Sequence, residues 1–359
     1  MYVPNNPTPP QGALFKNLLA TNEVRCAGVR AHAALLAYAP LTRPKLYRDF
    51  LRYNSALSDY IKRYKIDIVY AHEIWPAGAS AVLQGKSNGV GNVVVAYGEV
   101  HHTIEAHRRQ RRVEPYVLKG TDHVISTSQH CLDGALKRGA TPDRSSVIYA
   151  GVDTDRFHPL LDGNLIRRKY KIPPEGTIIS ALGLSLKRKL DTLLDALEIA
   201  NLGSDVYCLI GGIGEDHTYV EQRARSIRSV NVLTLGFVPE EELPAFYAAT
   251  DILVVSPKTQ MECMGQSMKE AMACGTVVAG ARIGGVPEAI EDGVNGLLFE
   301  PDDAQSLVQV LEALCKNRDL RERMGQAGRK IASKKFDAAV SASKTLSILL
   351  SAASQKSEL

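Results

Sequence analysis

The chain has 359 residues, more than one hydrophobic core usually takes, so we expect two domains. Hydrophobic residues make up 45% of it, an ordinary share for a globular protein, and no apolar run approaches the roughly 20 residues that a membrane span needs. The N-terminus has neither the basic start nor the apolar stretch of a signal peptide, and the six cysteines form no CxxC pair or zinc-type cluster. These features predict a cytoplasmic protein with free thiols.

The net charge of +4 hides a difference between the two parts of the chain. Residues 1–150 carry 19 Lys and Arg against 11 Asp and Glu, or +8, whereas the remainder carries 24 against 28, or −4. A basic N-terminal part fits an anionic partner, although ordinary variation in surface charge accounts for it equally well. The densest cluster of basic residues in this part is "HRRQRR" (107–112). It has two interpretations. It binds an anionic acceptor or an anionic membrane surface, or it is a solvated loop or helix face. Since no aromatic residues are interleaved with it, nucleic-acid binding is not predicted.

Apolar runs alternate with helical segments in the first part of the chain. Helical spacing over 43–64 precedes the first run, and a segment that ends on the C-cap glycine Gly139 follows the third. Buried strands that alternate with helices are typical of a doubly wound α/β sheet. The predicted strands cover 66–72, 92–97, 123–128 and 146–151.

A polar, proline-bearing stretch at 153–176 interrupts this pattern, and we place the domain boundary there. The alternation of strands and helices then resumes. It predicts two Rossmann-like doubly wound domains that face a central cleft. Ligands would bind in this cleft, at the carboxyl ends of the strands of both sheets. The domain bounds are 1–158 and 159–335, and 336–359 is a C-terminal helix that packs back on the N-terminal domain and ends in a polar tail. The strands of the second domain are 177–183, 205–212, 230–238, 251–257, 276–281 and 296–300, and its helices are 187–200, 217–228, 240–249, 266–274, 303–315 and a long segment over 319–352.

The stretch "MECMGQSMKEAMACGTVVAG" (261–280) holds two glutamates, Glu262 in a strand-end loop and Glu270 on the first turns of a helix. The helix begins near Gly265, and the N–H groups of Gly265, Gln266 and Ser267 make an anion site. An anion flanked by two hydroxyl-binding carboxylates describes a sugar bound to a phosphate. On spacing alone, a loop charge and a solvated helix residue explain the two glutamates as well.

Three other strand ends of the second domain carry similar features. In "GLSLKRKLDTLLDAL" (183–197), Lys189 stands at a helix start, where a lysine can reach a diphosphate. "LGFVPEEELPAFYAATD" (235–251) forms a tight loop whose backbone can bind the edge of a base, and "RIGGVPEAIEDGVNGLLFEPDD" (282–303) forms a Gly-Gly turn. Each has an ordinary loop interpretation, but four at successive strand ends favour one ligand site.

These motifs resemble those of the family 4 retaining glycosyltransferases, which have the two-Rossmann GT-B fold. "MECMGQSMKEAMACGTVVAG" is similar to the family's Glu-seven-residues-Glu motif, and "GGVPEAIEDGVNGLLFEPDD", "LGFVPEEELPAFYAATD" and "YAGVDTDRFHP" (149–159) are also close to its motifs. The resemblance covers about residues 66 to 330. It implies an N-terminal acceptor-binding domain and a C-terminal domain that binds the nucleotide-sugar donor.

The resemblance also implies roles for single residues. Glu270 would bind the ribose hydroxyls, Glu262 would hold a sugar hydroxyl near the reacting carbon, and Lys189 would neutralise the diphosphate. A helix N-terminus and a lysine can stabilise the departing charge, so no metal and no cofactor are expected. The other implied donor contacts are Gly12 in the N-terminal glycine loop, the N–H groups of Gly265, Gln266 and Ser267, and the backbone of Phe237 and Val238.

The sequence departs from the family pattern at three places. Leu184 occupies a donor-binding position at which the family usually has an arginine. Tyr97 occupies a position at which the family usually has a histidine. His101 or His102, a few residues on, is then the candidate for the catalytic histidine, and His72 at another strand end is a further candidate. We also expect the family's first strand to be shortened, since only three residues precede Pro4.

The sequence thus predicts a retaining, metal-independent glycosyltransferase that moves a sugar from a nucleotide-diphosphate sugar to an unknown acceptor. The acceptor would be a glycan, a lipid-linked sugar or a small molecule, and the enzyme would be cytoplasmic, with peripheral contact at the inner face of an anionic membrane. One alternative is a nucleotide-sugar epimerase on the same fold, against which the intact glutamate motif argues. Another is a non-catalytic homologue that binds nucleotide-sugars, which Leu184, Tyr97 and the short start would explain.

Overall fold

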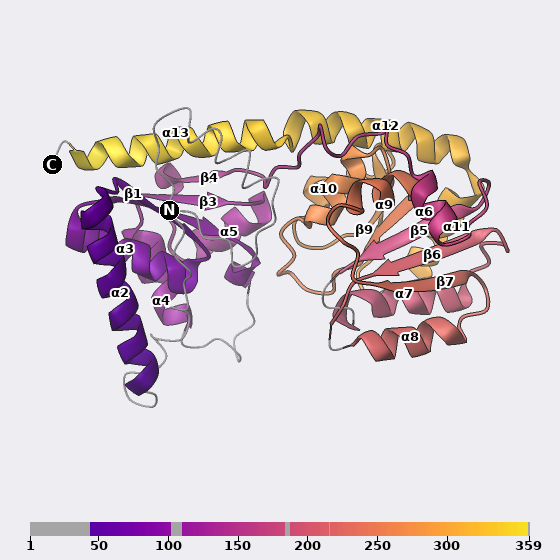
Figure 1. The fold of residues 1–359 in the computed structure, drawn as a ribbon, viewed down its shortest axis with the longest axis horizontal. Helices are drawn as coiled ribbons and strands as arrows, with labels where there is room; N and C mark the ends of the chain where they lie inside the picture. The colour runs from indigo at the N-terminus through magenta and orange to yellow at the C-terminus, as the bar shows by residue number, and fades with distance from the viewer. Residues whose placement is uncertain (1–43, 102–109, 184–186, 215, 358–359) are drawn as a thin grey trace. The chain divides into compact units, whose positions relative to one another are not determined.

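The computed structural model describes residues 44–101, 110–183, 187–214 and 216–357. The chain divides into two compact units (Figure 1). The first unit combines Met1–Gly151 with Ala338–Leu359, and the second is Val152–Asp337. The chain therefore passes between the units at 151/152 and 337/338. The sequence-based boundaries lie at 158/159 and 335/336.

Four parallel strands form the sheet of the first unit, in the spatial order β1-β2-β3-β4. All six residues of β2 are buried, and apart from Asn92 they are apolar or glycine, as expected for a strand that is covered on both faces. Helix α13 contacts β1 and β2 on one face of the sheet, and α3 and α5 cover the other face (Figure 1). The elements are α2 (Pro44–Tyr64), β1 (Ile68–His72), the short helix η2 (Ile74–Gly78), α3 (Ala79–Asn88), β2 (Gly91–Ala96), the short helix η3 (Gly98–His101), α4 (Gln110–Gly120), β3 (His123–Ser126), α5 (Gln129–Lys137), the short helix η4 (Pro142–Arg144), β4 (Ser145–Val147) and α13 (Ala338–Ser357).

Six parallel strands form the sheet of the second unit, in the spatial order β10-β9-β8-β5-β6-β7. The chain runs outward from β5 to β7 on one side and from β8 to β10 on the other, so the strand order reverses between β5 and β8. In open α/β sheets, ligands bind at the carboxyl ends of the strands beside such a switch point. The elements are α6 (Asn164–Lys169), β5 (Thr177–Leu182), α7 (Lys187–Ile199), β6 (Val206–Gly211), α8 (His217–Ser226), β7 (Asn231–Gly236), α9 (Leu243–Ala249), β8 (Ile252–Val255), α10 (Gln266–Ala273), β9 (Val277–Ala281), the short helix η5 (Val286–Glu288), β10 (Gly296–Phe299), α11 (Ala304–Lys316) and α12 (Arg318–Lys335).

A short helix, α6, lies inside the polar stretch that the sequence predicts as a linker. It has only six residues and buries only Ile166, so the sequence carries no helical stripe. Tertiary bonds anchor its position instead. The guanidinium of Arg167 donates to the carbonyls of Pro173 at 3.1 Å and Gly176 at 2.7 Å, and to the carboxylate of Asp251 at 3.2 Å.

The C-terminal segment, expected as one helix, forms two helices that are interrupted at Phe336 and Asp337. The Val152 N–H donates to the Phe336 carbonyl at 2.7 Å, and the Thr154 hydroxyl donates to the Asp337 carboxylate at 2.7 Å. These bonds fix Phe336 and Asp337, the two residues between the helices, to the segment at Val152 and Thr154. Helix α13 then covers the sheet of the first unit. No helix in the described ranges combines the length and apolarity needed to cross a membrane.

Candidate functional site

Glu262 lies in the loop between β8 and α10, on the carboxyl edge beside the switch point. The Gly285 N–H donates to the Glu262 carbonyl at 2.9 Å, so a second strand-end loop fixes the backbone of this residue. At Gly284, which has φ +61°, an added Cβ would lie 2.1 Å from the same carbonyl oxygen. Only glycine combines this left-handed backbone with such a close approach. The Gly-Gly turn of the sequence therefore positions the Glu262 loop.

The carboxylate of Glu262 lies beside the N-terminus of α10. A Cβ built on the N-cap residue, Gly265, would lie 3.6 Å from Glu262 Oε1 and 3.7 Å from Ser267 Oγ. Since the N-cap is a glycine, it has no side chain to cap the first turn, and the N–H groups of Gln266 and Ser267 point out of the helix end. The structure thus places Glu262 beside Gly265, Gln266 and Ser267, at a helix end of the kind that binds anions through backbone N–H groups.

Glu270 lies one turn further along α10 and is partly exposed. The hydroxyl of Tyr247, from α9, donates to Glu270 Oε2 at 2.9 Å. Burial raises the pKa of Glu270, while the Tyr247 hydrogen bond and the positive charges of Lys269 and Arg156 oppose that rise. Sequence reasoning named Glu270 but missed Tyr247, because the contact depends on how α9 packs against α10.

Lys269 is a charged residue in the core beside Glu270, with a relative exposure of 1%. Burial lowers its pKa to about 8, and the nearby Glu270, Cys263 and Glu262 act in the opposite direction. Sequence reasoning also missed this residue, although a signal was present. Met268 and Met272 mark the buried side of α10, and Lys269 lies next to Met268 on that side.

The carboxyl ends of β5, β6 and β7 are joined by backbone bonds. The Gly183 N–H donates to the Gly211 carbonyl at 3.1 Å, and the Gly212 N–H donates to the Gly236 carbonyl at 2.7 Å. Phe237 and Val238 follow directly, and the side chain of Phe237 is 61% exposed. These two residues therefore lie on the same edge of the sheet as the loops that follow β5 and β8.

Several predicted contacts cannot be placed. Gly12, Leu184 and His102 lie outside the described residues. The backbone of Lys189 lies in the first turn of α7, which begins at Lys187, but its side chain is outside the described part of the structure. The same holds for the side chains of the "HRRQRR" cluster.

The "DTD" segment at 153–155 acts as a turn. Asp153 Oδ1 accepts hydrogen bonds from the N–H groups of Asp155 at 3.1 Å and Arg156 at 2.9 Å. Arg156 in turn donates to Glu240 Oε1 at 2.9 Å. Within the described residues, no group of three or more His, Cys, Asp or Glu side chains could hold a metal ion.

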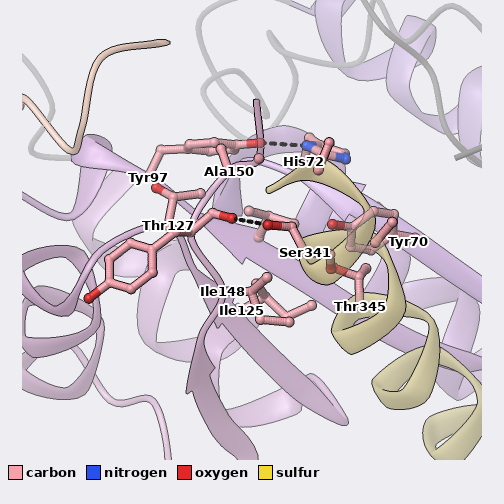
Figure 2. A pocket seen from close by; sticks show the side chains of 14 residues that line it. Tyr70, His72, Tyr97, Ile125, Thr127, Ile148, Ala150, Ser341 and Thr345 are labelled. Carbon is pink, nitrogen blue, oxygen red and sulfur yellow. Dashed lines mark hydrogen bonds between the residues drawn. The ribbon is translucent and has the colours of Figure 1, made fainter. Parts of the chain in front are cut away.

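In the first unit, the strands end around a cavity of about 140 Å³ below the N-terminal half of α13 (Figure 2). The hydroxyl of Tyr97 lies 2.6 Å from Nδ1 of His72, which joins the ends of β1 and β2. Burial lowers the pKa of His72 to about 4, so its ring is neutral at pH 7. Apolar side chains such as Ile125 and Ile148 line the cavity, and Ser341 and Thr345 face it from α13 (Figure 2).

His101 is held against α5. Its Nε2 lies 2.9 Å from the His130 carbonyl oxygen, and the two imidazole rings stack with centroids 3.7 Å apart. Burial lowers the pKa of His101. His101 is not among the residues that line the cavity, whereas His72 and Tyr97 are.

Glu99 is a buried carboxylate at the same sheet edge. Its Oε1 accepts from the Ile74 N–H at 3.1 Å, and its Oε2 accepts from the Tyr97 N–H at 2.9 Å. Burial raises the pKa of Glu99 to about 7, against the effect of these hydrogen bonds. The carboxylate thus links the segments that follow β1 and β2, and nothing in the sequence indicates this role.

Two α/β units with parallel sheets, and a glutamate loop at the switch point of the second, define the GT-B class of fold found in glycosyltransferases. Two family models match the chain: Glycosyltransferase Family 4 over residues 17–156 and Glycosyl transferases group 1 over residues 163–331. The chain belongs to this glycosyltransferase family.

Similar proteins include two named D-inositol 3-phosphate glycosyltransferase. That of Thermobifida fusca is 30% identical over 251 residues, which are 67% of this chain and 56% of that protein. That of Corynebacterium aurimucosum is 28% identical over 313 residues, 81% of this chain and 73% of that protein. Sulfoquinovosyl transferase SQD2 of Arabidopsis thaliana is 26% identical over 289 residues, 77% of this chain and 55% of that protein. The chain therefore spans between about half and three quarters of the length of these relatives.

Solved structures share the fold at lower sequence identity. HepE of Anabaena, in complex with UDP and glucose, has a TM-score of 0.77 and 19% identity, with 98% of both chains covered. Sucrose-phosphate synthase of Thermosynechococcus elongatus has a TM-score of 0.75 and 22% identity, with 90% of this chain and 82% of that chain covered. None of these relatives or solved structures is named an epimerase.

Proposed function

We propose that this protein transfers a sugar from a nucleotide-diphosphate sugar to an acceptor hydroxyl, with retention of the anomeric configuration and without a metal ion. The observation that carries the proposal is the position of Glu262. Its carboxylate lies beside the glycine-capped N-terminus of α10, at the topological switch point of the second unit. A site that pairs positive potential with a hydroxyl-binding carboxylate suits a phosphate joined to a sugar.

The donor residues have distinct roles in this proposal. The N–H groups of Gln266 and Ser267 bind the diphosphate, with the side chain of Lys189 as a further expected cation. Glu262 accepts a hydrogen bond from a sugar hydroxyl near the reacting carbon, and Glu270 accepts from the ribose. The loop at Phe237 and Val238 contacts the base.

The transition state resembles an oxocarbenium ion with a departing diphosphate. The bond between the anomeric carbon and the phosphate oxygen breaks, and the acceptor oxygen bonds to that carbon on the same face. The acceptor proton passes to the leaving phosphate oxygen, so no enzymic base is needed. The dipole of α10 stabilises the negative charge that develops on the leaving group.

The acceptor binds in the first unit, where His72 and Tyr97 line the cavity at the strand ends. A neutral imidazole and a phenol can orient a hydroxyl group through hydrogen bonds. Relatives named D-inositol 3-phosphate glycosyltransferase support a small-molecule acceptor, and a glycan or a lipid-linked sugar are the other acceptors that we propose to test.

The first experiment identifies the donor and then tests Glu262. A thermal-shift panel of nucleotide-sugars selects the donor, since a ligand at 100 times its dissociation constant stabilises by roughly 2.7 kcal/mol. In a transfer assay with an acceptor panel, Glu262→Ala lowers kcat by about 100-fold or more, as expected for a lost transition-state contact.

The matched control is Glu175→Ala, an exposed glutamate just before β5, at the opposite end of the same sheet. It leaves transfer unchanged. Wild-type-like transfer by Glu262→Ala contradicts the site assignment. Epimer formation from donor alone supports the epimerase alternative, and donor binding with neither transfer nor hydrolysis supports a non-catalytic homologue.

We further propose peripheral contact with an anionic membrane at its inner face, supported by the +8 charge of residues 1–150 and the "HRRQRR" cluster. Cosedimentation with vesicles containing 30 mol% phosphatidylserine should exceed that with pure phosphatidylcholine. The excess should disappear when the four arginines of the cluster are changed to glutamine. Equal sedimentation with both vesicle types would exclude the contact.

A further inference from the structure

Tyr247 is a fully buried side chain next to Glu270. It is 1% exposed, and its hydroxyl donates to Glu270 Oε2 at 2.9 Å. A buried hydroxyl without a partner is costly, and this hydrogen bond removes that cost. The bond uses one oxygen of the carboxylate and leaves Oε1 to accept from a ligand.

The ring of Tyr247 is fixed by aromatic neighbours and by its own backbone. Phe246 and Phe157 meet it edge to face, with centroids 5.6 Å and 6.0 Å away. The Thr276 hydroxyl donates to the Tyr247 carbonyl at 2.8 Å. The hydroxyl therefore has little freedom to leave Glu270.

Arg329 connects this aromatic cluster to the end of α10. Its Nη1 donates to the carbonyls of Phe157 at 2.8 Å and Ala273 at 3.0 Å. Phe157 belongs to the "GVDTDRFHP" segment, so that motif has a packing role here. It supports the ring that orients Glu270.

Burial raises the pKa of Glu270, while the hydrogen bond from Tyr247 and the positive charges of Lys269 and Arg156 oppose that rise. Burial also raises the pKa of Tyr247 far above its usual range, so the phenol remains protonated and donates its proton to the bond. A hydroxyl that donates to a carboxyl oxygen at 2.9 Å fixes the orientation of the carboxyl group.

We propose that Tyr247 is a positioning residue for donor binding: its hydroxyl holds the Glu270 carboxylate so that Oε1 faces the ribose hydroxyls. This inference rests on the proposed role of Glu270 at the ribose. Tyr247 itself touches neither the sugar nor the phosphates, so its loss weakens ribose recognition and leaves other donor contacts in place.

The test compares nucleotides with and without ribose hydroxyls. Calorimetry measures the dissociation constants of UDP, of GDP and of their 2′,3′-dideoxy counterparts. The proteins compared are wild type, Tyr247→Phe and a control, Tyr207→Phe. Tyr207 lies on β6. Of UDP and GDP, the nucleotide that wild type binds more tightly should bind at least 10-fold more tightly than its dideoxy form. Tyr247→Phe should lose most of that difference, while Tyr207→Phe should keep it.

The dideoxy form also reports whether the variant site is intact, because its affinity should be the same in all three proteins. If wild type discriminates and Tyr247→Phe discriminates equally, the positioning role is wrong, and the ribose role of Glu270 stands. If wild type does not discriminate at all, the ribose role fails, and the positioning role fails with it.

Discussion

Individual polar residues in buried positions organise both strand-end sites. In the second unit, Tyr247 and Lys269 lie beside Glu270, and in the first unit Glu99 joins two backbone segments. Each such residue must find a partner, because an unpaired buried polar group costs free energy. The sequence marks Lys269 by its position next to a methionine stripe, but nothing in it marks the partner of Tyr247 or Glu99.

Glu99 makes the stability of the first unit depend on pH. Its pKa is about 7 in the folded protein and 4.5 in the unfolded chain, so between these values only the folded state holds the proton. Stability due to this group is therefore lost as pH rises through that window. From pH 5 to pH 8, the free energy of unfolding of wild type should fall by about 2 to 3 kcal/mol relative to Glu99→Gln.

The measurement is urea unfolding followed by the fluorescence of Trp75, the one tryptophan in the sequence. Trp75 is buried in η2, next to Ile74, whose N–H donates to Glu99, so it reports on this unit. If the difference between wild type and Glu99→Gln is constant from pH 5 to pH 8, Glu99 does not titrate in this way.

At the scale of elements, one loop positions another. The turn before η5 places Gly284 against the Glu262 carbonyl, so two loops at neighbouring strand ends depend on each other. The sequence predicted both loops but not their contact. A motif that the sequence presents as an ordinary turn therefore fixes the backbone of Glu262.

Gly284→Ala should displace the Glu262 loop. A Cβ at 2.1 Å from a backbone oxygen cannot be accommodated in place, and the left-handed φ of +61° adds strain. We expect at least a 10-fold loss of transfer activity and a fall in unfolding free energy of about 1–3 kcal/mol. Transfer kinetics and thermal unfolding are the measurements.

Gly293→Ala is the matched control, because Gly293 also has a left-handed φ, +80°, but nothing lies within 4 Å of its added Cβ. This variant should lose a similar amount of stability from backbone strain and retain its transfer activity. Equal loss of activity in both variants would mean that strain, and not the contact with the Glu262 loop, is responsible.

Sequence periodicity alone does not predict where the helices of this protein begin and end. The pattern over 319–352 is helical throughout, yet the helix stops at Phe336 because Val152 and Thr154 bond to the two residues at the break. The short α6 is the opposite case, since the bonds of Arg167 to the Ala249 carbonyl and the Asp251 carboxylate support a helix where the sequence has a polar stretch. In both places, contacts distant in sequence outweigh local preference.

For the molecule as a whole, the amino-acid sequence is sufficient to predict the fold class and the order of the strands along the chain. All ten strands that the structure describes overlap predicted apolar runs, because strands of a parallel sheet that helices cover are rich in apolar residues. The local pattern likewise placed Glu262 in a strand-end loop and Glu270 on the first turns of the helix that begins near Gly265. These features depend on local composition and spacing, which a single sequence contains.

Which side chains meet at those strand ends depends on the three-dimensional packing. It paired Tyr247 with Glu270, Tyr97 with His72, and Glu99 with two backbone N–H groups, and it held His101 against α5. It also set the chain crossings at 151/152 and 337/338. Such contacts join residues far apart in the sequence, and they follow from packing geometry, which no local pattern encodes.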